Sequence, residues 1–322
     1  GFVQVIRDQG SIKFLIIRDI SGIIQVVITK DKKDALETVS RLSHESVVKI
    51  IGLAKEEKQA PGGFEIAAET ITILSLADPE LPIPVVEKGE QEETDQSIRL
   101  DWRWIDLRKP KNTLIFKVWT VMEQAFREYW LKQDYIEIHS PKLIATPSES
   151  GSEVFEVKYF ERKAYLAQSP QFYKQMAMAA GFEKVFEIGP VFRAEPSFTS
   201  RHATEFTGYD MEISYIESHY DVMAEEEHII HYAMQKVKDA YGQEILKLFE
   251  RDIPVPTMPF PRVSMEKAKE ILARMKVPSE KEGDLSPEEE RKICEHIKET
   301  EGHEFVFITE YPVSIRPFYH MR

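Results

Sequence analysis

The chain has 322 residues, of which 42% are hydrophobic and 30% charged, so it can bury a large core, and more than one domain is expected. Its single cysteine, Cys294, excludes a disulfide framework and a zinc site built from several cysteines. No run approaches the roughly 20 apolar residues that a bilayer crossing needs, which predicts a soluble, cytoplasmic protein with no membrane partner. The net charge of −13 argues against a general nucleic-acid binder but leaves room for a local basic face.

The first 76 residues are predicted to be mainly β-structure. Five short runs rich in β-branched residues are separated by polar turn signals, at 2–6, 13–18, 23–28, 46–53 and 63–76. A polar helix is predicted over 31–42. Five short strands with one helix in this order indicate a small closed barrel of the OB type.

A linker is predicted over residues 77–108, because prolines keep it extended and its segment 87–95 is acidic and polar. From Asn112 onward, apolar residues recur every three or four positions, which predicts an amphipathic helix of about twenty residues. The expected domains are therefore a barrel over 1–76 and, after the linker, a second domain over 109–322.

The second domain alternates strands with helices. Strands are expected at 135–138, 154–159, 163–167, 184–195 and 205–216, and helices from Pro170 and over 218–241. Two consecutive strands joined by a short polar loop predict an antiparallel pair rather than βαβ units, so the fold class is α+β. Neither glycine-rich nucleotide motif, of the Rossmann or the P-loop kind, is present.

The most informative stretch is the strand, loop and return strand around Arg193. Side chains two apart in a strand share a face, so Arg193 lies on the same side as Glu195, and Phe206 on the same side as Asp210 and Glu212. If both faces border one cleft, burying so many charges without a ligand would be costly. An exposed sheet face with interleaved charge pairs is the alternative, and the spacing alone leaves both open.

Two loops add candidates. Arg201 and His202, in the loop 196–204, are candidates for a polyphosphate clamp because a guanidinium binds phosphate oxygens in pairs. The loop 145–153 consists of small and turn-forming residues; a substrate lid with Glu149 inward is one interpretation, and an ordinary surface loop is the other.

A helix that starts near Ser169 offers a third candidate. Ser169 is expected as its N-cap and Pro170 as its first helical residue. Gln171 and Lys174 then share a face at its amino end, where a polar donor and a cation suit an anionic ligand. A solvated first turn is the alternative, but a lysine near a helix N-terminus is mildly unfavourable, which favours a function.

Taken together, these residues resemble class II aminoacyl-tRNA synthetases, specifically the archaeal and eukaryotic aspartyl type. Residues 185–206 are similar to the family's second class-defining motif, and the segment from Asn112 to Pro141 resembles the first, which builds the dimer interface. Gln168–Gln175 resembles the aspartate-recognition helix. The resemblance covers essentially the whole chain, including the barrel, which in the family binds the anticodon. It implies ATP-dependent activation of L-aspartate, transfer to tRNA(Asp) and a homodimer.

The resemblance also implies a role for each candidate residue. The expected catalytic residues are Arg193 and Lys174, which would hold the α-phosphate and the substrate's side-chain carboxylate. The remaining ATP-binding residues would be Glu195, Ser197, Arg201, His202 and Phe206, the last stacking on adenine. The remaining aspartate-binding residues would be Ser148, Glu149, Gln171, Asp210 and Glu212. In the barrel, Phe14 would stack on an anticodon base while Arg7, Gln25 and Glu65 read base edges.

The resemblance has departures. The family's chain continues through a third, glycine-rich motif that carries another phosphate-binding arginine and acidic magnesium ligands, so we expect that both ends of the native protein are absent here. ATP and Mg²⁺ are implied as ligands, with no metal ligand assigned within these residues. Pro61 lies where some archaeal-type enzymes that also charge tRNA(Asn) carry proline, which makes relaxed tRNA specificity a weaker hypothesis.

Two rival interpretations remain open. The first is an asparaginyl-tRNA synthetase or a synthetase-like asparagine synthetase, against which Pro170 and Lys174 argue, because asparagine presents a neutral amide rather than a carboxylate. The second is a non-catalytic paralogue that binds RNA or a partner protein. The missing third motif supports that paralogue, whereas the joint presence of Arg193, Glu195 and a phenylalanine at 206 opposes it.

Overall fold

The computed structural model describes residues 1–86, 94–148, 153–195, 203–279, 281 and 283–316. The chain divides into two compact units, Gly1–Thr113 and Leu114–Arg322, which we call the first and the second unit. Across the described residues, no helix combines the length and the apolar character needed to pass through a lipid bilayer.

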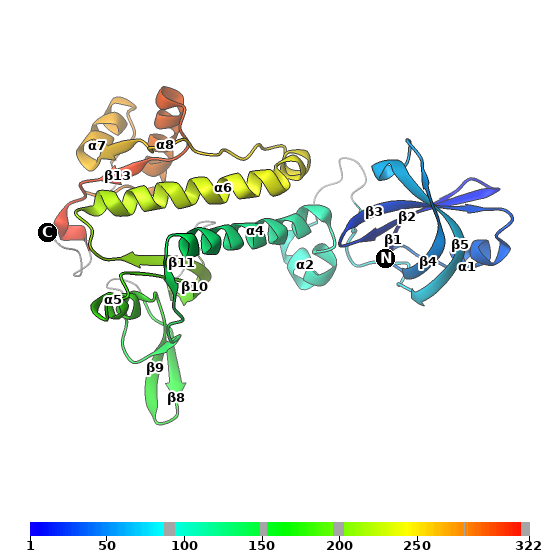
Figure 1. The fold of residues 1–322 in the computed structure, drawn as a ribbon, viewed down its shortest axis with the longest axis horizontal. Coiled ribbons are helices and arrows are strands. Elements are labelled where there is room, and N and C mark those ends of the chain that lie inside the picture. Colours follow the sequence, from blue (N-terminus) through cyan, green and yellow to red (C-terminus); the bar gives the residue numbers. More distant parts are fainter. Residues whose placement is uncertain (87–93, 149–152, 196–202, 280, 282, 317–322) are drawn as a thin grey trace. The chain divides into compact units, whose positions relative to one another are not determined.

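The first unit contains a closed five-stranded barrel (Figure 1). Its spatial order is β1 (Phe2–Asp8), β2 (Ile12–Asp19), β3 (Gly22–Thr29), β5 (Phe64–Ser75) and β4 (Val47–Glu56). Strands β1 to β3 are antiparallel, β3 and β5 are parallel, and the pairing of β1 with β4 closes the barrel. The helix α1 (Lys33–Ser40) lies between β3 and β4 along the chain. The predicted OB-type barrel is confirmed.

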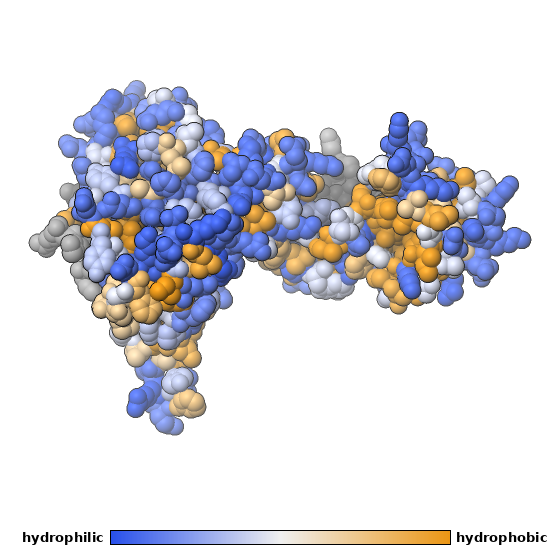
Figure 2. Space-filling model, in the orientation of Figure 1, coloured by the Kyte–Doolittle hydropathy of each residue, from blue (hydrophilic) through white to orange (hydrophobic). Residues whose placement is uncertain are grey.

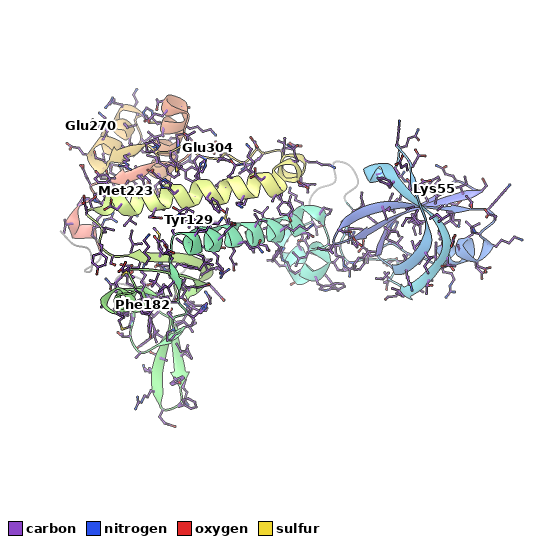
Figure 3. All side chains as sticks on the ribbon, in the orientation of Figure 1. Lys55, Tyr129, Phe182, Met223, Glu270 and Glu304 are labelled. Atoms are coloured by element: carbon purple, nitrogen blue, oxygen red, sulfur yellow. The ribbon has the colours of Figure 1, made fainter. Side chains whose placement is uncertain are left out.

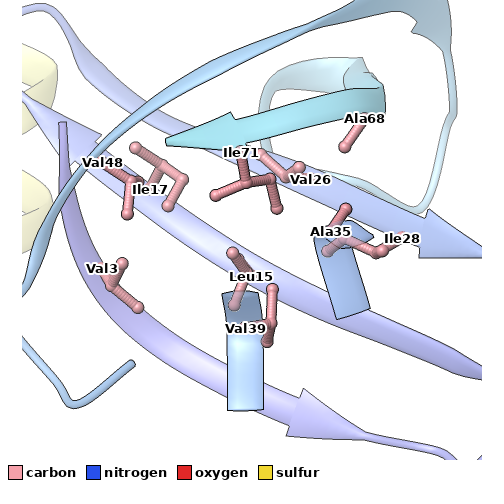
Figure 4. Close-up of a cluster of buried hydrophobic side chains, with 10 residues drawn as sticks. All are labelled: Val3, Leu15, Ile17, Val26, Ile28, Ala35, Val39, Val48, Ala68 and Ile71. Carbon is pink, nitrogen blue, oxygen red and sulfur yellow. The ribbon is translucent and has the colours of Figure 1, made fainter. Parts of the chain in front are cut away.

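Alternating side chains of the strands fill the barrel (Figure 4). The core consists of Val3, Leu15, Ile17, Val26, Ile28, Ala35, Val39, Val48, Ala68 and Ile71. The opposite set of side chains faces outward. Figure 2 shows hydrophobic residues gathered over β4 and β5 on the face in view, where Ile51 and Leu53 are about half exposed.

A buried ion cluster joins the barrel to the end of the first unit. The Glu45 carboxylate, 3% exposed, accepts hydrogen bonds from both terminal nitrogens of Arg18 at 3.0 and 2.8 Å and from Arg108 at 3.0 Å. Arg108 follows two short helices, α2 (Gln96–Asp101) and α3 (Arg103–Asp106). The unit therefore includes helical residues within the segment expected to be a linker.

A three-stranded sheet lies at the centre of the second unit, in the order β11 (Glu205–Ile213), β10 (Lys184–Phe192) and β6 (Ile136–Glu137). The helices α4 (Pro110–Lys132) and α6 (His219–Phe249) pack against one face of it (Figure 1). The rings of Trp130 and Phe186 stack at 4.7 Å between centroids, and Tyr129, labelled in Figure 3, contacts Tyr232 of α6 at 5.8 Å.

Smaller elements complete the second unit. A three-stranded sheet has the order β7 (Leu143–Ile144), β9 (Arg162–Leu166) and β8 (Glu156–Tyr159), and is followed along the chain by α5 (Gln171–Ala179). A lobe with its own apolar core contains β12 (Arg262–Ser264), α7 (Met265–Arg274), α8 (Pro287–Glu301) and β13 (Phe307–Thr309). Short helical turns lie at Pro61–Gly63 and Val313–Ile315. The predicted α+β class is confirmed.

Three predicted boundaries were wrong. The strand expected to reach residue 195 ends at Phe192, although the Arg193 amide still donates to the Thr204 carbonyl at 3.0 Å. Its partner ends at Ile213 rather than 216, because Tyr215 adopts a positive φ of 60°. The helix expected to end at residue 241 continues to Phe249.

Candidate functional site

The β10–β11 pair has one apolar and one polar face. Directly opposed residues of antiparallel strands project to the same side, and the register pairs Glu187 with Asp210 and Gly189 with Gly208. Phe186, which alternates with them, belongs to the core against α4 and α6. The other side, which we call the polar face, therefore carries Glu187, Gly189, Arg193, Phe206, Gly208, Asp210 and Glu212.

A lysine from α5 lies at one end of the polar face. The Lys174 ammonium forms an ion pair with Asp210 and a second one, at 3.3 Å, with Glu212. The lysine side chain is 14% exposed, and the two carboxylate side chains are 28% and 27% exposed. Burial in itself lowers the pKa of Lys174, but the attraction of Asp210 and Glu212 outweighs it, so the pKa lies above its ordinary value. The ammonium is therefore fully charged at neutral pH.

An aromatic ring and a guanidinium lie at the other end. The guanidinium carbon of Arg193 is 5.5 Å from the centroid of the Phe206 ring, which is 39% exposed. The Nε of Arg193 is buried and has no hydrogen-bond partner among the described residues. Glu195 follows directly and is half-buried. This end can stack on a planar base and donate to an anionic oxygen.

The middle of the polar face lies low because both strands have glycine there. A Cβ on Gly208 would approach no atom more closely than Val191, at 3.7 Å, and the Gly189 carbonyl oxygen, at 3.8 Å. Phe206 and Asp210 are four residues apart, which spans about 14 Å of strand. The face thus has room for an elongated ligand with a base at one end and a charged group at the other.

The start of α5 brings together two further predicted residues. Ser148, 3% exposed, donates its amide hydrogen to Gln168 Oε1 at 3.1 Å, and its hydroxyl lies 3.5 Å from that of Ser169. Gln171 is 9% exposed. The predicted N-cap was wrong: Pro170 is itself the N-cap, one position later than expected, while the Ser169 hydroxyl accepts from the Gln171 amide at 3.2 Å.

The polar face also contains an ion pair that the sequence analysis missed. Glu187, 4% exposed, accepts hydrogen bonds from the Ser140 amide at 3.0 Å and from the Lys142 ammonium. The two-residue spacing of Glu187 and Gly189 was a visible signal, but nothing in the sequence connects Lys142 to that strand. Four candidates, Glu149, Ser197, Arg201 and His202, lie outside the described residues.

The four candidate residues of the barrel share its outer face. Arg7 is opposite Phe14 in the β1–β2 pair, and Gln25 is beside Glu65 in the β3–β5 pair. Gln25 Nε2 donates to Glu65 Oε2 at 3.0 Å. Leu15, which alternates with Phe14, points into the core. The outer face thus offers one ring for stacking beside one cation and two polar groups that can read a base edge.

No group of three or more histidine, cysteine, aspartate or glutamate side chains in the described ranges is arranged to hold a metal ion. The carboxylates of the polar face are instead paired with Lys142 and Lys174. These residues do not form a metal centre by themselves, so no step below is assigned to a metal.

Comparison with known proteins agrees with this geometry. The family described as tRNA synthetases class II (D, K and N) matches residues 95–322, and the OB-fold nucleic acid binding domain matches residues 1–74. The chain belongs to the class II tRNA synthetases of the D, K and N group. The resemblance seen in the sequence is thereby confirmed.

Curated relatives narrow the comparison to one amino acid. The chain is 42% identical to the aspartate–tRNA(Asp/Asn) ligase of Methanopyrus kandleri and 41% identical to the aspartate–tRNA(Asp) ligase of Pyrococcus furiosus, over 100% of this chain and 73% of each relative. Among solved structures, the asparaginyl-tRNA synthetase of Pyrococcus horikoshii complexed with asparaginyl-adenylate superposes with a TM-score of 0.84 at 33% identity, over 99% of this chain and 72% of that one.

Proposed function

We propose that this protein activates L-aspartate with ATP, forming aspartyl-adenylate and pyrophosphate, and transfers the aspartyl group to tRNA(Asp). The observation that carries the proposal is the placement of Lys174 and Arg193 on one polar face, about 14 Å of strand apart. That distance suits an amino acid joined to a nucleotide. The aspartate–tRNA ligases among its relatives, about 40% identical over the whole chain, support the same activity.

Activation requires positioning rather than an enzymic nucleophile. A carboxylate oxygen of aspartate attacks the α-phosphorus, the new O–P bond forms, and the bond to the β-phosphate breaks with pyrophosphate leaving. Phe206 would stack on adenine, Glu195 would accept from its amino group, and Arg193 would hold the α-phosphate and neutralise the growing charge. Ser197, Arg201 and His202 would bind the rest of the nucleotide.

The amino acid end is complementary to aspartate. Lys174 would pair with the side-chain carboxylate, and Asp210 would take the α-ammonium group, which competes for the same carboxylate as Lys174 does in the free protein. Glu212 would hold Lys174 in place, while Ser148, Glu149 and Gln171 would contact the remaining polar groups. Asparagine has a neutral amide in place of the carboxylate and would leave the lysine cation without a charged partner.

Amino-acid-dependent ATP–pyrophosphate exchange tests this assignment. We expect exchange with L-aspartate and none with L-asparagine. Exchange with asparagine alone would identify an asparaginyl-tRNA synthetase, ammonia- and ATP-dependent amide formation on free aspartate would identify an asparagine synthetase, and absence of exchange with binding of tRNA would support a non-catalytic paralogue.

The outer face of the barrel would bind the anticodon. Phe14 would stack on one base, and Arg7, Gln25 and Glu65 would read base edges. A second substrate, tRNA(Asn), is favoured by Pro61, which starts the turn between β4 and β5, and by the tRNA(Asp/Asn) specificity in the name of the Methanopyrus relative. Charging of both transcripts tests it, and no aspartyl-tRNA(Asn) would remove it.

Two features of the assembly remain proposals. Helix α4 exposes the apolar side chains of Ile115, Phe116 and Trp119, which fit a two-fold interface between copies of the chain. Synthetases of this family use ATP with a divalent metal ion, and we propose Mg²⁺ accompanying the nucleotide. The cytoplasm, where tRNAs are charged, is the expected site of action.

A further inference from the structure

The ion pair between Lys142 and Glu187 lies on the polar face, outside the set of residues assigned above. Glu187 is almost fully buried and accepts two hydrogen bonds, one from Lys142 and one from the Ser140 amide. The Lys142 ammonium also donates to the Ser140 hydroxyl at 3.1 Å. The lysine side chain remains 25% exposed, so the ammonium is held in place and is still accessible to a ligand.

The glycine at 189 fixes which side of the sheet this ammonium occupies. A Cβ added to Gly189 would lie 3.5 Å from Lys142 Nζ and 3.1 Å from Glu187 Oε1. The Cβ direction at Gly189 is that of the polar face, because Gly189 is opposite Gly208 and alternates with core residues. The cation is therefore at the middle of the face, about 7 Å of strand from Asp210 and as far from Phe206.

An unassigned charge of the substrate matches this position. Aspartate brings two carboxylates and one ammonium; Lys174 takes the side-chain carboxylate and Asp210 the ammonium, which leaves the α-carboxylate to meet the α-phosphate between the two ends. Two anions that approach each other need a cation near their meeting point. An ammonium has three N–H donors, and among the described residues Lys142 uses two of them on Glu187 and Ser140.

We propose that Lys142 binds the anionic oxygens at the reaction centre with its third N–H, and that Glu187 is a positioning residue for it. The ligand chemistry is an anionic oxygen, supplied either by the α-carboxylate of aspartate or by the α-phosphate of the nucleotide. Lys142 stays protonated throughout, and no proton moves in the step. This inference rests on the proposed function.

The test separates the cation from its contribution to the fold. Lys142→Met combined with Glu187→Gln removes the ammonium without leaving a buried carboxylate unpaired, and Glu187→Gln alone keeps the ammonium. Lys269→Met is the matched control, because Lys269 is 22% exposed and pairs with the fully buried Glu289 in the separate lobe. Thermal unfolding of each variant shows whether it is folded.

In the full-length protein, we expect aspartate-dependent exchange to fall about 100-fold in the double variant, less than about tenfold in Glu187→Gln, and hardly in Lys269→Met. Binding assigns the oxygen. A fall in the affinity ratio of L-aspartate to L-aspartol, in which CH₂OH replaces the α-carboxylate, assigns the α-carboxylate, and a fall in the ratio of AMP to adenosine assigns the α-phosphate.

Both ratios unchanged in the folded double variant would overturn the inference, even if exchange fell, because the loss would then be structural. Equal losses in Glu187→Gln and in the double variant would overturn it as well. If the wild-type protein shows no exchange with aspartate, the proposed function fails, whereas the two binding ratios still decide whether Lys142 contacts an anionic oxygen.

Discussion

Replacing Lys174 by methionine is the sharpest test of the amino acid end of the site. The side chain is 14% exposed, so its pairing with a carboxylate is mostly shielded from water. Truncating one partner of such a pair costs about 2–5 kcal/mol, which corresponds to a fall of about 30- to 5,000-fold in kcat/KM for aspartate. The KM for ATP should change less than about threefold, because the nucleotide end is about 14 Å away along the strand.

The fold should survive this change. Asp210 and Glu212 lose their cation, but both are more than a quarter exposed and water can solvate them, so we expect a loss between the 1 kcal/mol of an exposed pair and about 3 kcal/mol for a buried one. Lys163→Met, which removes an exposed pair with Glu156 in the β8–β9 hairpin, is the control. Exchange kinetics at varied aspartate and ATP provide the measurement, and a fall below about fivefold for aspartate would refute the assignment.

Four other outcomes are expected. Phe206→Leu should weaken ATP binding by about 1–3 kcal/mol in calorimetry with little change in melting temperature, and unaltered ATP affinity would exclude stacking on this ring. Phe14→Ala should raise the KM for tRNA by a similar free energy while leaving aspartate-dependent exchange intact; the reverse pattern would contradict an anticodon role. Glu45→Gln should destabilise the first unit by about 3–5 kcal/mol in urea, since it leaves two arginines without their buried carboxylate, and a loss under about 1 kcal/mol would show that the cluster contributes little. The pKa of Lys174 is raised on folding, so its pairing stabilises fully below pH 10.5 and is lost as the pH rises through the raised pKa; the stability gap between wild type and Lys174→Met should shrink only there, and a gap that closes below about pH 9 would contradict this.

Local patterns were sufficient to predict the barrel and the polar face. Each barrel strand is a short run of β-branched residues between turn signals, and its alternation separates Phe14 from the core residue Leu15. The same two-residue period places Asp210 and Glu212 on one side of β11, where the structure has them. These features depend on neighbours in sequence, which is why no alignment of distant segments was needed.

Contacts between distant segments could not be predicted in this way. Lys142 reaches Glu187 across 45 residues, and Lys174 reaches Asp210 across 36, through a packing of the strand pair with α5 and with the segment before β7. The early end assigned to α6 has a local cause. Gly242 has poor helix propensity, but in the structure it is a buried residue within the helix, where tertiary packing outweighs a cost of about 1 kcal/mol.

The two facing glycines differ in what an added methyl group would disturb. At Gly189 it would crowd Glu187 and Lys142, whereas at Gly208 it would make only ordinary contacts and would occupy the floor beneath the ligand. Gly208→Ala should therefore yield a protein that expresses, melts and purifies like the parent but cannot seat its substrate. Screens that score variants by solubility or thermostability would pass it as neutral, and only a catalytic assay would reveal the defect.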